Sequence, residues 1–282
     1  SRTTTAANDR LRGEELMLSA LEHDPANRRA LGSYSRLLTM SGQRWKSTPW
    51  LAQYVVRFDD SRQQLIWLSD ASVVITDWDL LKTARQSFPN DPLPPLGLAF
   101  DALLDRPKDA VRELQACLRI SPGMIEANAL LGRALLDSGD EDAYQSWDRG
   151  LSAEFEIHPE VWRARGMWWR DRDPGKALRC YLECCRRAPD DAETNLQISL
   201  LLNQEGEMEA AAVFRTRFGL IVAYLDLVRA VREGNDLSVA SSAAKLADQL
   251  QRPAESIGWR RVAAQQRGPA SGPDDTDVVA ED

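Results

Sequence analysis

The 282-residue sequence predicts an all-α protein, folded as a right-handed α-solenoid of stacked helix hairpins. Alanines recur at intervals of 33 or 34 residues, and a bulky side chain follows each alanine four positions later. These pairs are Ala110 with Leu114, Ala143 with Trp147, Ala177 with Tyr181, and Ala210 with Phe214. A fixed period of this length is typical of helical repeat arrays, in which each hairpin buries its apolar face only by stacking on its neighbours. We expect roughly six or seven such hairpins.

Prolines and glycines recur with a similar spacing. Pro89, Pro122 and Pro189 each follow an apolar helical segment, and proline ends a helix because it has no backbone N–H to donate. Gly132 and Gly166 lie 34 residues apart, each in the first helix of its unit. Since glycine has no side chain, we expect a second helix to approach closely at both positions.

The residues of the best unit resemble the tetratricopeptide repeat. Trp162, Gly166, Trp169, Ala177, Tyr181, Cys184 and Pro189 stand in the family's order of Trp, Gly, Tyr, Ala, Phe, Ala and Pro. The best unit spans 161–189, and the clearest repeats cover 92–218. The resemblance implies a solenoid of tetratricopeptide-like hairpins, in which the first helix of each repeat lines a concave groove.

Apolar segments alternate with short polar turns on both sides of the clear repeats. We expect divergent repeats in 9–91 and 219–252, and a capping helix in 254–266 that shields the last apolar face. Residues 1–8 are polar and 267–282 are acidic, which predicts a disordered N-terminus and a disordered tail or linker. The helices predicted outside the clear repeats are 11–22, 28–40, 50–58, 63–74, 78–88, 220–232, 237–250 and 254–264.

Three sequence segments carry a looser resemblance to repeat regions of bacterial, planctomycete-like tetratricopeptide proteins that are associated with ASPIC-type modules. The segments are His-Pro-Glu-Val-Trp from His158, Arg-Cys-Tyr-Leu-Glu from Arg179, and Glu-Ser-Ile-Gly-Trp-Arg from Glu255. This resemblance brings no catalytic residue with it.

The composition disfavours nucleic acid and membrane as partners. The chain has 35 lysines and arginines against 43 acidic residues, a formal net charge of −8, and an acidic chain repels phosphate backbones. No apolar stretch reaches the ~20 residues that a membrane helix needs. The sequence starts at Ser1, so the compartment stays open: the protein is expected to be soluble, and either cytoplasmic or exported or anchored through a preceding segment.

The residues that could do chemistry do not form a recognisable set. The two histidines, His23 and His158, fall in different repeats, and neither has a nucleophile beside it in the sequence. Cys180 and Cys184 share one helical face, but Cys184 occupies a packing position of the repeat, which favours a buried thiol over a metal ligand. We therefore predict no catalytic residue, metal or cofactor, and an enzyme remains only a residual alternative.

Four of the nine tryptophans fall in the clear repeats. Trp147, Trp162 and Trp169 lie on or beside signature positions, which predicts packing between helices. Trp168 lies off the pattern and is the one expected to be exposed.

A basic segment is the sharpest indication of a binding site. Arg163, Met167 and Arg170 recur at i, i+4 and i+7, which predicts one helical face, with Arg133 and Asn203 at corresponding places in the neighbouring repeats. Guanidinium groups bind carboxylates through paired hydrogen bonds, so these five residues predict a groove for an acidic peptide or another protein. The alternative is a solvated helix face whose charges form local ion pairs.

Two functions therefore stay open beside the residual enzyme. The first is a non-catalytic protein–protein interaction scaffold that binds a partner in the concave groove. The second is an accessory or assembly subunit of a larger enzyme complex or filament, which docks edge-on through exposed aromatic side chains.

Overall fold

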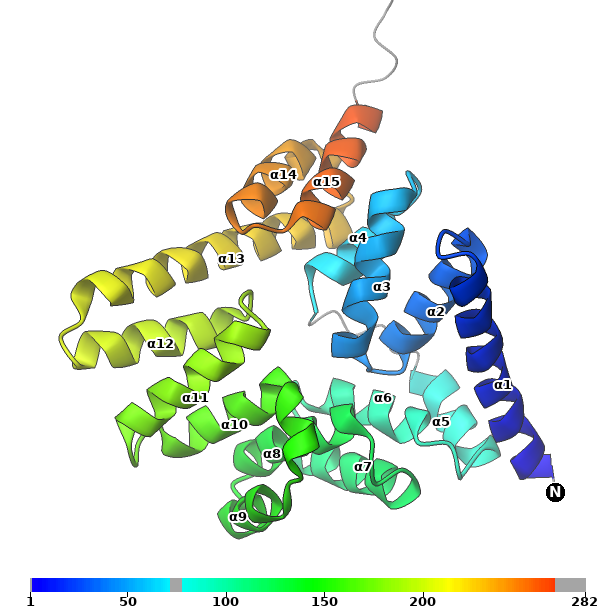
Figure 1. Ribbon diagram of the computed structural model, residues 1–282, viewed down its shortest axis with the longest axis horizontal. Helices are drawn as coiled ribbons and strands as arrows, with labels where there is room; N and C mark the ends of the chain where they lie inside the picture. The colour runs from blue at the N-terminus through cyan, green and yellow to red at the C-terminus, as the bar shows by residue number, and fades with distance from the viewer. Residues whose placement is uncertain (1, 72–77, 267–282) are drawn as a thin grey trace, which may run out of the picture.

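The computed structural model describes residues 2–71 and 78–266, and every regular element in these two ranges is a helix. The fold is an all-α helical repeat solenoid, as the sequence predicts. Successive helices pack as neighbours, and the chain bends round until its last helices meet the third and fourth ones (Figure 1). The predicted acidic tail, 267–282, lies outside the described residues.

The first five helices follow the predicted order with shifted ends. The helix predicted at 28–40 is confirmed, whereas the one predicted from Trp50 begins six residues earlier and contains Pro49. The first helix begins at Arg2, so the structure differs from the disorder predicted for 1–8; each residue added to a formed helix gains a hydrogen bond. The bounds are α1 Arg2–His23, α2 Arg28–Met40, α3 Arg44–Arg57, α4 Arg62–Ser69 and α5 Trp78–Ser87.

The clear repeats form the regular part of the solenoid. Pro89, Pro122 and Pro189 each stand two residues after a helix end, as predicted. Asp140, Asp173 and Asp191 cap three of the helices, each accepting a hydrogen bond from a backbone N–H of the first turn. The elements are α6 Leu93–Ala102, α7 Pro107–Ile120, α8 Ile125–Asp137, α9 Glu141–Gly150, the 3-10 helix η1 Ala153–Ile157, α10 Pro159–Trp169, α11 Pro174–Arg187 and α12 Ala192–Gln204.

The two glycines of the repeats allow the close approach that the sequence predicts. A Cβ atom on Gly132 would lie 2.3 Å from the ring of Trp147, and one on Gly166 would lie 2.7 Å from the ring of Tyr181. An aromatic ring of the second helix thus rests on the glycine of the first in α8–α9 and in α10–α11.

Two of the four alanines that repeat in the sequence lie in the core, and the other two do not. Ala110 and Ala177 are the fourth residues of α7 and α11 and are fully buried. Ala143 and Ala210 are the third residues of their helices, so the inward position passes to the next residue: Tyr144 in α9 and Ala211 in the following long helix are buried instead. One residue of difference at the helix start turns a side chain by about 100° around the axis.

The long helix α13, Met208–Gly234, joins two helices that the sequence separates. Its 27 residues continue through Gly219, which lies between the clear repeats, predicted to end at 218, and the helix predicted to begin at 220. A single glycine inside a helix costs only about 1 kcal/mol relative to alanine, so it does not end a helix that is packed on both sides of it. The helix ends at Gly234, and the residue that follows it, Asn235, has a left-handed φ of 50°.

The last helices close the array rather than cap a free end. They are the 3-10 helix η2 Leu237–Val239, α14 Ala240–Gln249 and α15 Pro253–Gln266. A helix is present where the sequence predicts one, at 254–264, and this helix, α15, packs against α3 and α4 as well as α14. Leu51, Val55 and Leu65 share one hydrophobic core with Tyr224 of α13 and Trp259 of α15.

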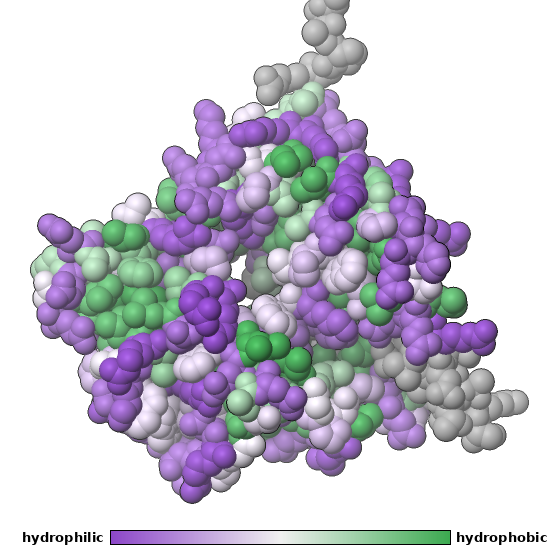
Figure 2. Space-filling model, in the orientation of Figure 1, coloured by the Kyte–Doolittle hydropathy of each residue, from purple (hydrophilic) through white to green (hydrophobic). Residues whose placement is uncertain are grey.

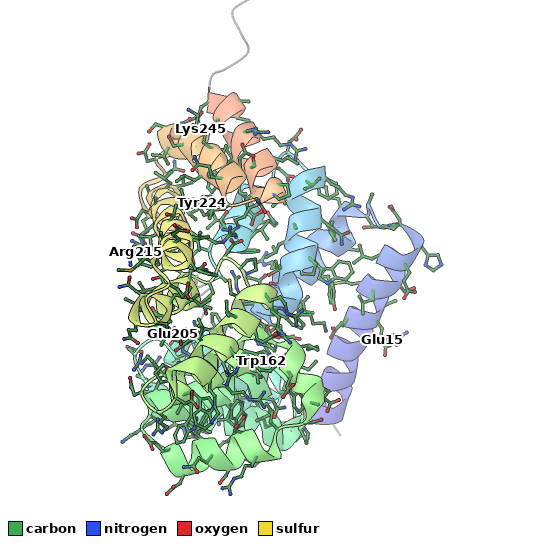
Figure 3. The ribbon with its side chains drawn as sticks, turned by 60° about the vertical axis from the view of Figure 1, so that its left-hand side comes forward. Glu15, Trp162, Glu205, Arg215, Tyr224 and Lys245 are labelled. Atoms are coloured by element: carbon green, nitrogen blue, oxygen red, sulfur yellow. The ribbon has the colours of Figure 1, made fainter. Side chains whose placement is uncertain are left out.

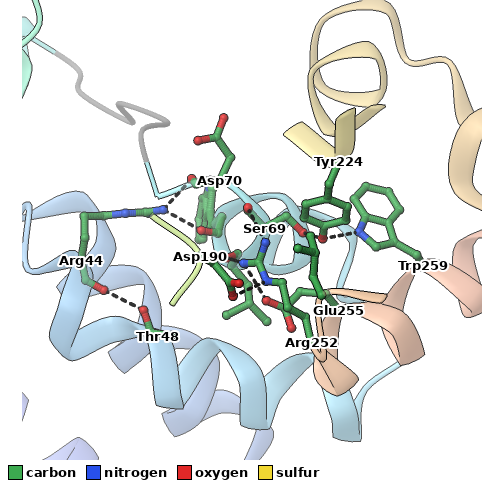
Figure 4. Close-up of polar contacts among 12 residues, drawn as sticks. Arg44, Thr48, Ser69, Asp70, Asp190, Tyr224, Arg252, Glu255 and Trp259 are labelled. Carbon is green, nitrogen blue, oxygen red and sulfur yellow. Dashed lines mark hydrogen bonds and ion pairs between the residues drawn. The ribbon is translucent and has the colours of Figure 1, made fainter. Parts of the chain in front are cut away.

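Buried polar contacts hold this closure together (Figure 4). The hydroxyl of Tyr224 lies 2.6 Å from Ser69 Oγ and accepts a hydrogen bond of 2.8 Å from Trp259 Nε1. Arg252 donates to the backbone carbonyls of Leu68 and Ser69, at 3.1 and 3.3 Å. The closure therefore satisfies the carbonyls at the end of α4, which otherwise have no partner within the helix.

Candidate functional site

The five residues of the predicted groove come from three helices. Arg133 lies on α8, Arg163 and Met167 on α10, Arg170 directly after α10, and Asn203 on α12. Arg170 and Asn203 are exposed, whereas Arg133 is half-buried and pairs with Asp137 at 3.2 Å. Met167 packs against the apolar cluster of α11 and α12. No described hydrogen bond or ion pair links one of the five to another.

Arg163 is buried, which corrects its predicted place on an exposed basic face. Its guanidinium lies 3.0 Å from Glu160 Oε2 and 3.3 Å from Asp191 Oδ2. Burial lowers the pKa of Arg163, but the two carboxylates outweigh burial and raise it, so the group stays charged. The bond to Asp191 joins α10 to the cap of α12, and Arg163 therefore serves packing between repeats.

The first turn of α3 covers the start of α8 and of α10. The backbone N–H of Trp45 donates to Glu126 Oε1 at 2.9 Å, and the Trp45 ring lies 5.2 Å from the ring of His158. Burial raises the pKa of Glu126 to about 7 and lowers that of His158 to about 3. The first turn of α3 thus covers the first residues of α8 and the N-cap of α10.

A cleft of about 470 Å³ lies between α10 and α11. Its wall on α10 is made by Trp162 and Trp169, which are seven residues apart and therefore share one helical face. Figure 3 labels Trp162 in this part of the molecule. The residues lining the cleft, called the Trp162–Trp169 cleft below, are Trp162, Trp169, Lys176, Arg179, Cys180, Leu182 and Glu183.

Local contacts fix the two indole rings. Trp162 Nε1 donates to the carbonyl of Glu156 at 2.7 Å, and the guanidinium groups of Arg165 and Arg187 lie 5.1 and 5.0 Å from its ring centre. Lys176 Nζ lies 4.3 Å from the ring centre of Trp169. Cations at these distances are attracted to the aromatic face. The rings are thus held in place before any partner arrives.

The rim of the cleft carries one unpaired cation. Arg179 is exposed and has no ion pair with any described residue. Lys176 pairs with Asp173 at 3.0 Å, and Glu183 is bound by Arg187 and Arg186, whose hydrogen bonds lower the pKa of this carboxyl. Leu182 beside them is 40% exposed. The cleft thus offers an apolar wall together with a free guanidinium.

The thiols near the cleft are not reactive nucleophiles. Burial raises the pKa of Cys180 above its ordinary value and that of Cys184 to about 12. Because a thiolate is the nucleophilic form, both groups are poorly reactive near neutral pH. Cys184 is buried against Thr194, at the packing position that the repeat pattern predicts.

The structure corrects the prediction for one tryptophan of α10, Trp168, and confirms it for another, Trp169. Trp168 is half-buried: it stacks on Tyr144 with ring centres 5.0 Å apart, and Arg172 lies 3.6 Å from its centre. Trp162 and Trp169 line the cleft, and Trp169 also packs against the apolar cluster of α11 and α12, as the repeat signature predicts for it. Their spacing of seven residues is a signal in the sequence that could have indicated a shared face.

A larger cleft, of about 580 Å³, lies between α5, α6 and α7, and the cations that line it are in ion pairs with other described residues except for Lys82, which lies over the ring of Trp78. Arg85 pairs with Glu113, Arg106 with Asp101, and Arg112 with Asp109. A ligand would have to replace these ion pairs, so we regard the Trp162–Trp169 cleft as the better candidate.

No helix in 2–71 or 78–266 is both long and apolar enough to cross a membrane.

The comparisons with known proteins bear on the fold. No protein-family model and no curated protein matches the sequence. Among solved structures, the crystal structure of the APC/C hetero-tetramer Cut9–Hcn1 has a TM-score of 0.50 and 14% identity, and the similarity covers 91% of this chain and 50% of that chain. The human IFIT1 dimer with PPP-AAAA gives 0.36 and 14%, over 73% and 58% of the two chains, and MamA gives 0.19 and 13%, over 74% and 86%.

The chain therefore spans half the length of the Cut9–Hcn1 chain that it resembles. At 14% identity this likeness shows the fold alone, and that fold is a solenoid of tetratricopeptide-like helix hairpins.

Proposed function

We propose that the chain is a non-catalytic protein–protein interaction scaffold that binds a segment of another protein in the Trp162–Trp169 cleft. The observation that carries the proposal is an apolar cleft with two fixed indole rings and one unpaired arginine at its rim. Tryptophan and arginine are the residue types that contribute most to binding energy in protein interfaces. Helical repeat arrays present extended surfaces of this kind to partners.

The chemistry of the cleft favours an acidic peptide with an apolar side chain. An aliphatic or aromatic side chain would contact Trp162, Trp169 and Leu182. A carboxylate one or two residues away would reach Arg179 and form charge-assisted hydrogen bonds. The partner therefore belongs to the class predicted from the sequence, although the site is a different one.

The structure favours this cleft over the predicted groove. Arg163 is buried in ion pairs, so the arginine pair that the groove needed is reduced to Arg170. The Trp162–Trp169 cleft instead presents aromatic side chains on one hairpin, which is closer to the edge-on docking of an accessory subunit. Cut9, in the structure with the similar fold, is part of a hetero-tetramer with Hcn1.

A displayed library of random 12-residue peptides, selected on the full chain, tests the proposal. We expect enriched peptides to carry an aromatic or aliphatic residue next to Asp or Glu. The affinity of these peptides should fall at least tenfold for the variants Arg179→Glu and Leu182→Asp, both of which change exposed side chains.

The variant Arg119→Glu is the matched control, because Arg119 is an exposed arginine on α7 without a described ion pair. It should bind the peptides like the unmodified chain. Peptides that bind Arg179→Glu and Leu182→Asp unchanged would place the binding surface elsewhere, and the absence of any enriched peptide would contradict the scaffold function itself.

A further inference from the structure

A second surface, separate from the cleft, lies over α12 and the first half of α13. Figure 2 shows a large apolar patch over these two helices. The large exposed apolar side chains of α12 and the first half of α13 are Leu200, Met208 and Val213, with exposed fractions of 45%, 64% and 66%. We call this surface the α12–α13 face. Contiguous exposed apolar surface of this kind marks a contact site in soluble proteins.

The path of α13 explains why the face is uncovered. α12 packs against α11 and the first half of α13, as in the preceding hairpins. The second half of α13 turns its buried residues, Ile221, Tyr224 and Val228, into the core of the closure with α4 and α14. The chain after α12 thus leaves the stack, and no later hairpin among the described residues, which end at 266, covers this end of it. A helix in that place would bury the face as the next repeat does elsewhere in a solenoid.

The charges around the face determine what kind of helix fits. Between residues 192 and 216 there are four acidic side chains and one basic one, Arg215. Glu205, Glu207 and Glu209 are exposed, and none of them has an ion pair with another described residue. Figure 3 labels Glu205 at the turn between α12 and α13 and Arg215 further along α13. An apolar surface beside three unpaired carboxylates attracts a partner that is apolar at its centre and basic at its edge.

We propose that the α12–α13 face binds an amphipathic helix of another protein, whose apolar stripe is flanked by lysine or arginine. The stripe packs on Leu200, Met208 and Val213, and the basic flank pairs with the glutamates of the turn. A second copy of this chain is a poorer occupant, because it would bring the same glutamates against one another, and the whole chain carries a charge of −8. This is the helix-in-groove type of recognition.

The test uses a displayed library of 18-residue amphipathic helices with a fixed apolar stripe and randomised flanks, selected on the full chain. We expect the enriched helices to carry Lys or Arg in the flank. Their affinity should fall at least tenfold with Val213→Asp, and by a smaller factor, which high salt removes, with Glu207→Lys/Glu209→Lys.

Leu104→Asp is the matched control for Val213→Asp, since Leu104 is 65% exposed and lies between α6 and α7. This variant should bind the helices unchanged. The proposal is overturned if no helix is enriched, if acidic flanks are enriched, or if Val213→Asp and Leu104→Asp behave alike. It is also overturned if the chain dimerises and Val213→Asp abolishes the dimer, because the occupant is then a second copy. Arg179→Glu should leave helix binding intact, which separates this result from the test of the Trp162–Trp169 cleft.

Discussion

The regular stack, from α6 to the first half of α13, and the closure of α3 and α4 with α13–α15 are built from different kinds of contact. In the stack, contacts join helices that lie close together in the chain, as where the rings of Trp147 and Tyr181 rest on Gly132 and Gly166. In the closure, the hydrogen bond between Ser69 and Tyr224 joins residues 155 positions apart. The first kind of contact repeats along the chain, and the second occurs once.

The two kinds of contact predict different effects of a destabilising substitution: a local effect in the stack, and an effect on both ends of the chain in the closure. A solenoid without closure is stabilised by nearest-neighbour interfaces, so a damaged repeat affects mainly its neighbours. A closed array adds one interface that depends on both ends of the chain. A substitution that destabilises the helices on one side of that interface should therefore also destabilise the helices on the other side.

The largest expected effect is that of charge reversal at Arg163. Arg163→Glu would place three carboxylates together in the stack and remove the bond between α10 and the cap of α12. The loss of one partner from a buried ion pair costs about 3–5 kcal/mol, so we expect the free energy of unfolding to fall by at least that amount. Chemical denaturation measures it. Arg170→Glu, at an exposed site, should change stability by less than about 1 kcal/mol; equal effects would mean that Arg163 is not buried.

Replacing one glycine by alanine in each region allows the packing of the stack and of the closure to be compared. Gly132→Ala forces the Trp147 ring to move, and overpacking of this kind costs about 1–3 kcal/mol. Gly258→Ala, in the closure, meets side-chain atoms of Leu65 and Val55 at 2.8 Å and should cost a similar amount, because both side chains are fully buried and valine is stiff at χ1. Calorimetry should show one transition for both variants. Two separate transitions in Gly258→Ala would break the claim that the closure is part of one cooperative unit.

Two buried tyrosine hydroxyls provide a matched pair with opposite expectations. Tyr224→Phe removes the group that Ser69 and Trp259 both contact, and unsatisfied buried polar groups cost about 1–3 kcal/mol. The hydroxyl of Tyr144, in the stack, is buried without a hydrogen-bond partner among the described residues, so Tyr144→Phe should be neutral or stabilising. Equal destabilisation in urea titrations would contradict both assignments.

A pH-dependent effect concerns Glu126, where the first turn of α3 meets the stack. Its pKa is raised by burial from 4.5 to about 7, so between these values the folded chain holds a proton that the unfolded chain has released. Stability from this group therefore falls as pH rises from 4.5 to 7. His158, whose pKa is lowered by burial to about 3, has the opposite slope between pH 3 and 6.5.

Glu126→Gln keeps an acceptor for Trp45 but cannot ionise. The variant should therefore gain stability over the unmodified chain as pH rises from 5 to 8, which thermal melts across that range measure. A difference that stays constant with pH would show that the carboxyl titrates normally.

The residues that repeat are the ones whose structure could be predicted from the sequence. The helix at 28–40, the prolines two residues beyond helix ends, and the rings over Gly132 and Gly166 all follow from local periodicity and the stereochemistry of proline and glycine. The continuous α13 and the contacts of α15 do not, because they depend on partners 150 or more residues away.

The candidate site was predictable only in its chemistry. The arginines on and directly after α10 indicated an acidic partner, and the unpaired Arg179 lies on the next helix, α11. Whether an arginine is unpaired depends on carboxylates such as Asp191, which lies 28 positions from Arg163. The spacing of residues along one helix does not predict a pair between two helices. The indole spacing of Trp162 and Trp169 was visible, but the repeat signature assigned both to packing.

The contacts of α15 also bear on the order in which the chain can fold during synthesis. The apolar side chains of α3 and α4, such as Leu65, leave the ribosome well before Tyr224 and Trp259, with which they form a core. An ordinary solenoid can begin to fold at either end and extend by one repeat at a time. Here α3 and α4 cannot bury their apolar side chains until α13 and α15 have been synthesised. Closing the long segment of chain between them is slow compared with stacking neighbouring helices. A growing chain that stops before α13 would therefore expose that uncovered surface to aggregation and to chaperones.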